Sequence, residues 1–138
     1  MAGQLNLFRS RKQRGTAPPA PSEYQLHCAV ADTVRRWIMP GWIFTHIASG
    51  EKRDMVTAAR LKRMGVTAGW PDLLFLGPVG ELCAIELKAK GGRMSEAQAA
   101  VMRHLIAGGH GYLCSDNYRN VIETLKGWGV LRSGIHVQ

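Results

Sequence analysis

The chain has 138 residues, of which 46% are hydrophobic, and this is enough for one folded domain with its own core. Its formal net charge of +8 favours a polyanionic partner; nucleic acid is the first expectation and an anionic membrane surface the second. No apolar run reaches the roughly 20 residues of a membrane span, and no signal-peptide core is present. An integral membrane protein is therefore excluded, and we expect a cytoplasmic protein whose three cysteines are reduced.

Residues 1–21 form the first segment of the chain. They carry Arg9, Arg11, Lys12 and Arg14 without any acid, and a proline-rich stretch follows. Such a composition predicts a disordered basic arm. It is either a solvated tail or an extra contact to nucleic-acid phosphates, and both interpretations stay open. The folded domain is expected over residues 22–138.

The domain shows an alternation of helical and strand patterns in chain order. Ser22 and Gln25 form a capping-box pattern that opens the first helix, and Ser95 and Gln98 form a second one. The predicted elements are a helix over 22–39, a strand over 42–47, a helix over 54–64, strands over 72–76 and 81–88, a helix over 95–107, a strand over 111–114 and a helix over 117–128. This order predicts an α/β fold with a mixed sheet flanked by helices.

The predicted hairpin holds two acids and a lysine within apolar strands. Glu86 and Lys88 are two residues apart and share one face of their strand. Asp72 joins that face only if paired residues have numbers that sum to 158, which requires a three-residue turn over 78–80. A four-residue turn without a bulge would place Asp72 on the opposite face. Our hypothesis is that Asp72 and Glu86 are juxtaposed.

A buried carboxylate without a compensating charge costs several kcal/mol, so these acids indicate a cation. Two carboxylates, a backbone carbonyl and water make an oxygen-rich site that suits Mg²⁺ or Mn²⁺ better than zinc. Such an ion supports in-line displacement at a phosphate. Lys88 would orient the attacking water or neutralise the phosphate. The alternative is that Asp72 caps the end of a strand and Glu86 is an exposed surface acid, so that the two have no joint role.

Three segments carry a resemblance to a known family. Gly69-Trp70-Pro71-Asp72, Ile85-Glu86-Leu87-Lys88 and Ser95-Glu96-Ala97-Gln98, with Glu23 on the first helix, resemble the virus-type replication-repair nuclease (VRR-NUC) family of the PD-(D/E)xK superfamily. The resemblance covers about residues 22–128 and implies a restriction-endonuclease-like core. Trp70 departs from it, because a small or aliphatic residue is usual there.

The resemblance also implies roles for individual residues. Asp72, Glu86 and the Leu87 carbonyl resemble the metal ligands, and Lys88 the catalytic lysine. Glu23 and Gln98 resemble the family's first-helix acid and its helix-borne glutamine. Gln98 is equally explained as part of a capping box, and Glu23 as an acid favoured by the helix dipole.

Other charged and metal-binding residue types carry weaker signals. The five histidines show no metal-binding spacing and are interpreted as structural, with His46 the least secure exclusion. Lys62, in a basic helix, is either a solvated residue or a phosphate clamp. Lys90 and Arg93 lie in a glycine-rich basic loop and are candidate nucleic-acid contacts.

The favoured function is a Mg²⁺- or Mn²⁺-dependent deoxyribonuclease, a hydrolase of ester bonds. The resemblance implies branched DNA such as a Holliday junction as the substrate, a homodimer with two active sites, and a phage-type protein in a bacterial cytoplasm. One alternative is a non-catalytic DNA-binding module. A sequence-specific restriction-type nuclease is weaker, because no target-reading domain is visible.

Overall fold

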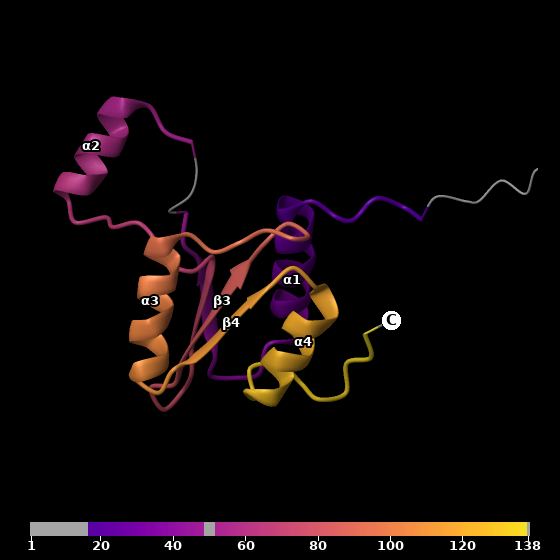
Figure 1. Cartoon of the computed structure of the whole chain (residues 1–138). Helices are drawn as coiled ribbons and strands as arrows, with labels where there is room; N and C mark the ends of the chain where they lie inside the picture. The colour runs from indigo at the N-terminus through magenta and orange to yellow at the C-terminus, as the bar shows by residue number, and fades with distance from the viewer. Residues whose placement is uncertain (1–16, 49–51, 138) are drawn as a thin grey trace, which may run out of the picture.

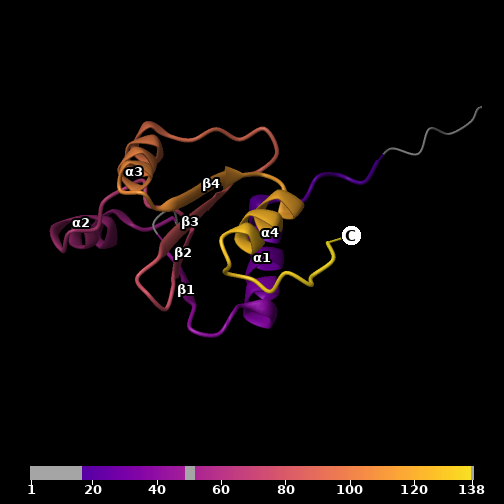
Figure 2. The same cartoon turned by 90° about the horizontal axis from the view of Figure 1, so that it is seen from below.

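The computed structural model describes residues 17–48 and 52–137. Figures 1 and 2 show a central sheet with α3 on one face and with α1 and α4 on the other. The elements follow the predicted order: α1 (Glu23–Trp37), β1 (Ile43–His46), α2 (Met55–Arg63), β2 (Leu73–Leu76), β3 (Leu82–Leu87), α3 (Glu96–Ala107), β4 (Gly111–Ser115) and α4 (Tyr118–Gly127). The predicted basic arm lies mostly outside the described residues, since its four basic side chains precede residue 17.

The four strands form one sheet in the order β1-β2-β3-β4. The β1–β2 and β2–β3 pairs are antiparallel, whereas β4 runs parallel to β3. The parallel pair needs a crossover connection, and α3 supplies it. The predicted mixed sheet flanked by helices is therefore confirmed. Because β2 is antiparallel to both of its neighbours, β1 and β3 end at the sheet edge where β2 begins, and the candidate site lies at this edge.

Two of the helices begin with the capping boxes expected from the sequence. In α1 the Ser22 side chain accepts from the Gln25 amide while the Gln25 side chain accepts from the Ser22 amide. Ser95 and Gln98 repeat this arrangement at α3. Each box satisfies backbone amides that would otherwise have no partner in the first turn. The first turn of α3, which carries Gln98, is therefore fixed by residues that are only three apart in the sequence.

The core lies between the sheet and the α1–α4 layer. Alternate residues of β2 and β3 point into it, together with apolar residues of both helices. Its fully buried members include Val30, Val34, Leu73, Phe75, Ile85, Leu87, Ile122 and Leu125. The tryptophans Trp37, Trp42 and Trp128 are partly buried and pack against this core.

The spacing of Met55, Ala58, Leu61 and Met64 in the sequence predicts that these apolar residues of α2 are buried, and the structure differs from this prediction. None of its nine residues, all of them in the described part of the chain, is buried. Met55 is 88% exposed and Met64, its C-cap, 77% exposed. Figure 1 shows the reason: α2 stands away from the sheet, beyond the start of α3, so the spacing of its apolar residues has no core to face. The prediction of burial was wrong, while the helix itself was predicted correctly.

Candidate active site

The register of the β2–β3 hairpin places the first acid opposite the second. Leu73 pairs with Ile85 and Leu76 with Leu82, so paired numbers sum to 158. The Gly77 amide donates to the Glu81 carbonyl over 2.8 Å and closes a three-residue turn over 78–80. Asp72 directly precedes β2 and therefore lies across from Glu86. The predicted register is confirmed, and no bulge is needed.

The Asp72 carboxylate is held by the backbone of the neighbouring strand. Its Oδ2 accepts from the Leu87 amide over 2.7 Å, which fixes the carboxylate beside the end of β3. The Leu87 carbonyl, expected as a further metal ligand, belongs to the same residue. The Leu87 side chain is fully buried in the core on the opposite face. The Leu87 backbone amide therefore holds the Asp72 carboxylate, while the Leu87 side chain packs in the core.

Glu86 is a buried acid within this arrangement. Its side chain is 2% exposed, and its Oε1 lies 2.8 Å from the Lys88 Nζ, whose side chain is 13% exposed. Its Oε2 is buried without a hydrogen-bond partner among the described residues. Burial raises the pKa of Glu86, and the Lys88 hydrogen bond offsets only part of this effect. An unpaired buried carboxylate oxygen is costly and is the kind of atom that a cation would satisfy.

Lys88 shows the matching electrostatic response. Burial lowers its pKa, but the hydrogen bond and the charge of Glu86, helped by the charge of Glu23, outweigh burial and leave the pKa raised. Lys88 therefore remains a cation at neutral pH. Its position supplies one fixed positive charge to a site that otherwise holds acids.

Gln98 has both of the roles that the sequence allows, because it caps α3 and contacts other residues of the site. Its Oε1 accepts both from the Ser95 amide, over 2.8 Å, and from the Lys88 Nζ, over 3.0 Å. Its Nε2 donates to the Glu86 Oε1. One amide therefore caps α3 and bridges the Glu86–Lys88 pair. The capping box orients Gln98, so the cap and the contact support one another.

Gly69 explains how the loop before Asp72 approaches α3. It has a φ of +97°, and a Cβ added there would lie 2.3 Å from the Ala97 carbonyl oxygen and 2.9 Å from the Gln98 amide nitrogen. Only glycine satisfies both the conformation and the close approach. The next residue, Trp70, is 40% exposed, and its Nε1 donates to the Thr67 Oγ1 over 3.0 Å. The unusual tryptophan therefore folds back on its own loop.

Glu23 lies at the rim of the site. Glu23 lies one turn before Leu26 on the apolar stripe of its helix, which predicts that it points toward the interior, but its side chain is exposed. Its Oε2 accepts from the Ala89 amide over 3.2 Å. This contact ties the first turn of α1 to the chain just beyond Lys88. Glu23 thus comes close to the expected partners but contacts the backbone of Ala89 rather than their side chains.

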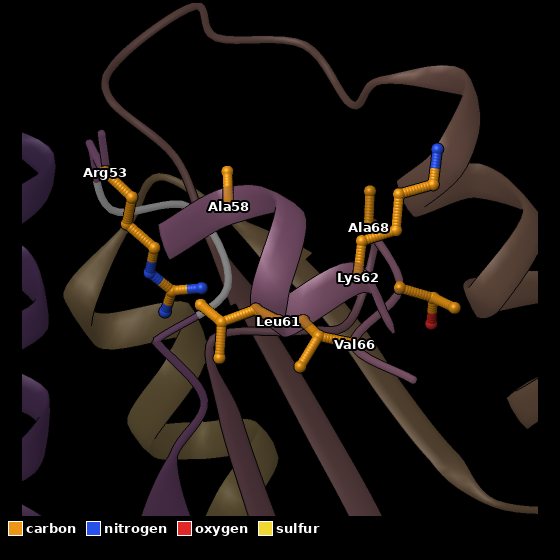
Figure 3. A pocket seen from close by; sticks show the side chains of 7 residues that line it. Arg53, Ala58, Leu61, Lys62, Val66 and Ala68 are labelled. Carbon is orange, nitrogen blue, oxygen red and sulfur yellow. The ribbon is translucent and has the colours of Figure 1, made fainter. Parts of the chain in front are cut away.

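The candidate phosphate contacts are spread over the surface. Lys62 and Arg53 line a hollow of about 700 Å³ between α2 and the loop over 66–68. In Figure 3 the Arg53 guanidinium points toward Leu61, whereas Lys62 extends away from it. Lys90 and Arg93 are exposed on the loop between β3 and α3. Arg9, Arg11, Lys12 and Arg14 lie outside the described residues.

Two histidines that the sequence analysis set aside lie next to Asp72. His27, on α1, and His46, at the end of β1, have ring centroids 4.5 Å apart in an edge-to-face contact. The His46 Nδ1 lies 2.8 Å from the Asp72 carbonyl oxygen. Burial lowers the pKa of His27, and the neighbouring His46 adds to this effect. No sequence spacing signals this cluster, because its members come from three separate elements.

The described features define an α/β fold with an acidic, lysine-containing site at one edge of a mixed sheet. The sequence matches no protein-family model and no curated protein. Among solved structures, the chain is similar to a protein described as "VRR_NUC domain protein", with a TM-score of 0.63 and 23% identity over 78% of this chain and 88% of that one. The two proteins share a fold. At that level, the match agrees with the resemblance of the motifs.

The part of the chain that the structure describes contains no helix that is both long and apolar enough to cross a membrane. Cys28, Cys83 and Cys114 form no disulfide with one another.

Proposed function

We propose that the protein is a metal-dependent endonuclease of the VRR-NUC family that hydrolyses phosphodiester bonds in DNA. The observation that carries this proposal is the buried Oε2 of Glu86, which has no hydrogen-bond partner among the described residues. Glu86 lies across the hairpin from Asp72 and beside Lys88. In a purely structural acid both carboxylate oxygens would be paired or exposed, since an unsatisfied buried carboxylate oxygen destabilises the fold. The shared fold supports the same assignment.

The residues present fit a hard divalent cation. Asp72 and Glu86 offer carboxylate oxygens, the Leu87 carbonyl is a further candidate, and all three suit Mg²⁺ or Mn²⁺. When bound, such an ion lowers the pKa of a coordinated water and stabilises negative charge on the phosphate.

The remaining residues have separate tasks in this proposal. Lys88 stays charged and orients the water or neutralises a phosphate oxygen. Gln98 holds Lys88 and Glu86 at a fixed separation through its two contacts. Glu23 joins α1 to the same end of the sheet. Lys62, Lys90, Arg93 and the basic residues of the arm attract the DNA backbone without reading sequence.

We further propose branched DNA, such as a four-way junction, as the substrate and a homodimer as the active form. The family resemblance supports both. A symmetric dimer presents two equivalent sites to the two strands that must be cut in a junction. The net charge of +8 matches a substrate in which several phosphate backbones converge.

A cleavage assay tests the function. The purified full chain is incubated with linear, flap and four-way-junction DNA in Mg²⁺, in Mn²⁺ or in EDTA. We expect metal-dependent cutting that is fastest on branched DNA, and sedimentation should give the mass of a dimer. Failure to cut any of the three substrates in either metal would leave only a DNA-binding module. Equal cutting of linear and junction DNA would remove the structure selectivity alone.

A further inference from the structure

The cluster of His27, His46 and Asp72 is chemically different from the proposed hydrolytic site. Each of the three residues offers one ligand atom, and these atoms all lie within 4.8 Å of one another. They come from α1, β1 and the residue preceding β2, which converge at one edge of the sheet. The proposed hydrolysis uses Asp72 but gives neither histidine a task. The convergence of two imidazoles and a carboxylate therefore requires its own explanation.

The hydrogen bond of His46 favours a ligand role over simple packing. The Asp72 carbonyl can only accept, so the His46 Nδ1 at 2.8 Å carries the proton, and the neutral ring then has its lone pair on Nε2. A backbone carbonyl that holds one ring nitrogen is the usual support of a metal-bound histidine. The carbonyl that holds His46 is that of Asp72, and the Asp72 Oδ2 accepts from the Leu87 amide. Two of the three candidate ligands are thus oriented by neighbouring backbone groups.

We propose that His27, His46 and Asp72 form a second metal site that takes a borderline divalent ion such as Mn²⁺, Co²⁺ or Zn²⁺. Imidazole nitrogen suits these ions, whereas Mg²⁺ prefers an all-oxygen shell. Three protein ligands leave coordination positions open for water. This second site shares only Asp72 with the hydrolytic one. From these ligand preferences, Mn²⁺ occupies both sites, whereas Mg²⁺ occupies the carboxylate site alone.

The test measures metal binding directly and does not depend on cleavage. The full chain, without a histidine tag and stripped of metal, is titrated with Co²⁺ in excess Mg²⁺, and binding is followed by visible absorption and calorimetry. The compared proteins are wild type, His27→Asn, His46→Asn and, as a control on an exposed histidine of α3, His104→Asn. Circular dichroism establishes that each variant is folded; His46 is exposed, so its variant remains informative if His27→Asn misfolds.

We expect one Co²⁺ per chain in the wild type and in His104→Asn, with affinity at least about 10-fold weaker in His27→Asn and His46→Asn. Equal Co²⁺ affinity in all four proteins would overturn the second site. In Glu86→Gln we expect cleavage to be lost and Co²⁺ binding to persist; if Co²⁺ binding disappears there instead, the ion sits at the carboxylate site and the proposal fails. Histidine-dependent binding in a protein that cuts no DNA would retain this site and reject the nuclease function.

Discussion

The edge of the sheet around Glu86 and the helix α2 contrast in how their charged residues are supported. At the sheet edge, Glu86, Lys88 and Gln98 contact one another, and Glu86 is 2% exposed. In α2 the basic residues surround an apolar surface that faces solvent, and none of its residues in the described structure is buried. Both regions are rich in charge, but only the first is positioned by the core.

Under the proposed function, this difference separates catalysis from attraction of the DNA backbone. Chemistry on a phosphate requires groups held within fractions of an ångström, and the sheet edge supplies that rigidity through backbone hydrogen bonds and the α3 cap. Attraction of a DNA backbone tolerates mobile side chains, because it depends on charge and distance. The comparison predicts that changes at the sheet edge act on cleavage and that changes in α2 act on binding.

The largest effect is expected from the charged pair itself. Glu86→Gln and Lys88→Ala should each reduce cleavage by at least about 100-fold, the range seen when one preorganised charge-stabilising group is removed. Affinity for junction DNA should change little, because phosphate contacts are spread over many residues. Rates come from single-turnover cleavage and affinities from fluorescence anisotropy in EDTA. Loss of DNA binding together with cleavage would contradict this division of roles.

A smaller effect is expected from two glycines with nearly the same φ. Gly69 has a φ of +97° and no room for a Cβ, while Gly65, at the end of α2, has a φ of +99° and no atom within 4 Å of the added Cβ. Gly65→Ala should cost only the conformational strain, about 1 kcal/mol in the free energy of unfolding. Gly69→Ala should cost at least about 2 kcal/mol, because it also displaces the loop from Ala97 and Gln98.

Chemical denaturation measures both glycine variants, and cleavage rates complete the comparison. Gly69→Ala should also slow cutting, since it moves Asp72 relative to Gln98, whereas Gly65→Ala should leave the rate unchanged. Equal destabilisation by the two variants would show that the close approach to α3 contributes nothing.

The smallest effect is expected from α2. Lys62→Ala should weaken DNA binding modestly and lower the slope of log affinity against log salt by about 1, as expected for the loss of one phosphate contact. The melting temperature and the cleavage rate at saturating DNA should stay unchanged. Lys52→Ala, which removes another exposed cation just before α2, is the comparison for a purely long-range charge effect. An unchanged salt slope for Lys62→Ala would make Lys62 a solvated residue.

Local patterns in the sequence predicted most of the architecture and part of the site. The capping boxes at Ser22 and Ser95 mark the starts of α1 and α3, because a cap involves only residues three apart. The hypothesis that Asp72 and Glu86 share one face required paired residues whose numbers sum to 158, since side chains alternate along a strand, and the hairpin has this register. Burial in α2 was predicted wrongly, because periodicity describes one helix and cannot say whether a second surface covers it.

The sequence by itself predicted the order of the elements and the mixed sheet, and it limited Asp72 and Glu86 to two alternatives, which differ in the length of one hairpin turn. The structure contains the three-residue turn that places these two acids opposite each other. Only the tertiary structure decided that Gln98 bridges Glu86 and Lys88 while capping α3, and that His27 and His46 meet beside Asp72. These contacts join elements far apart in the chain. Their distances depend on how the helices pack against the sheet, which no local spacing encodes.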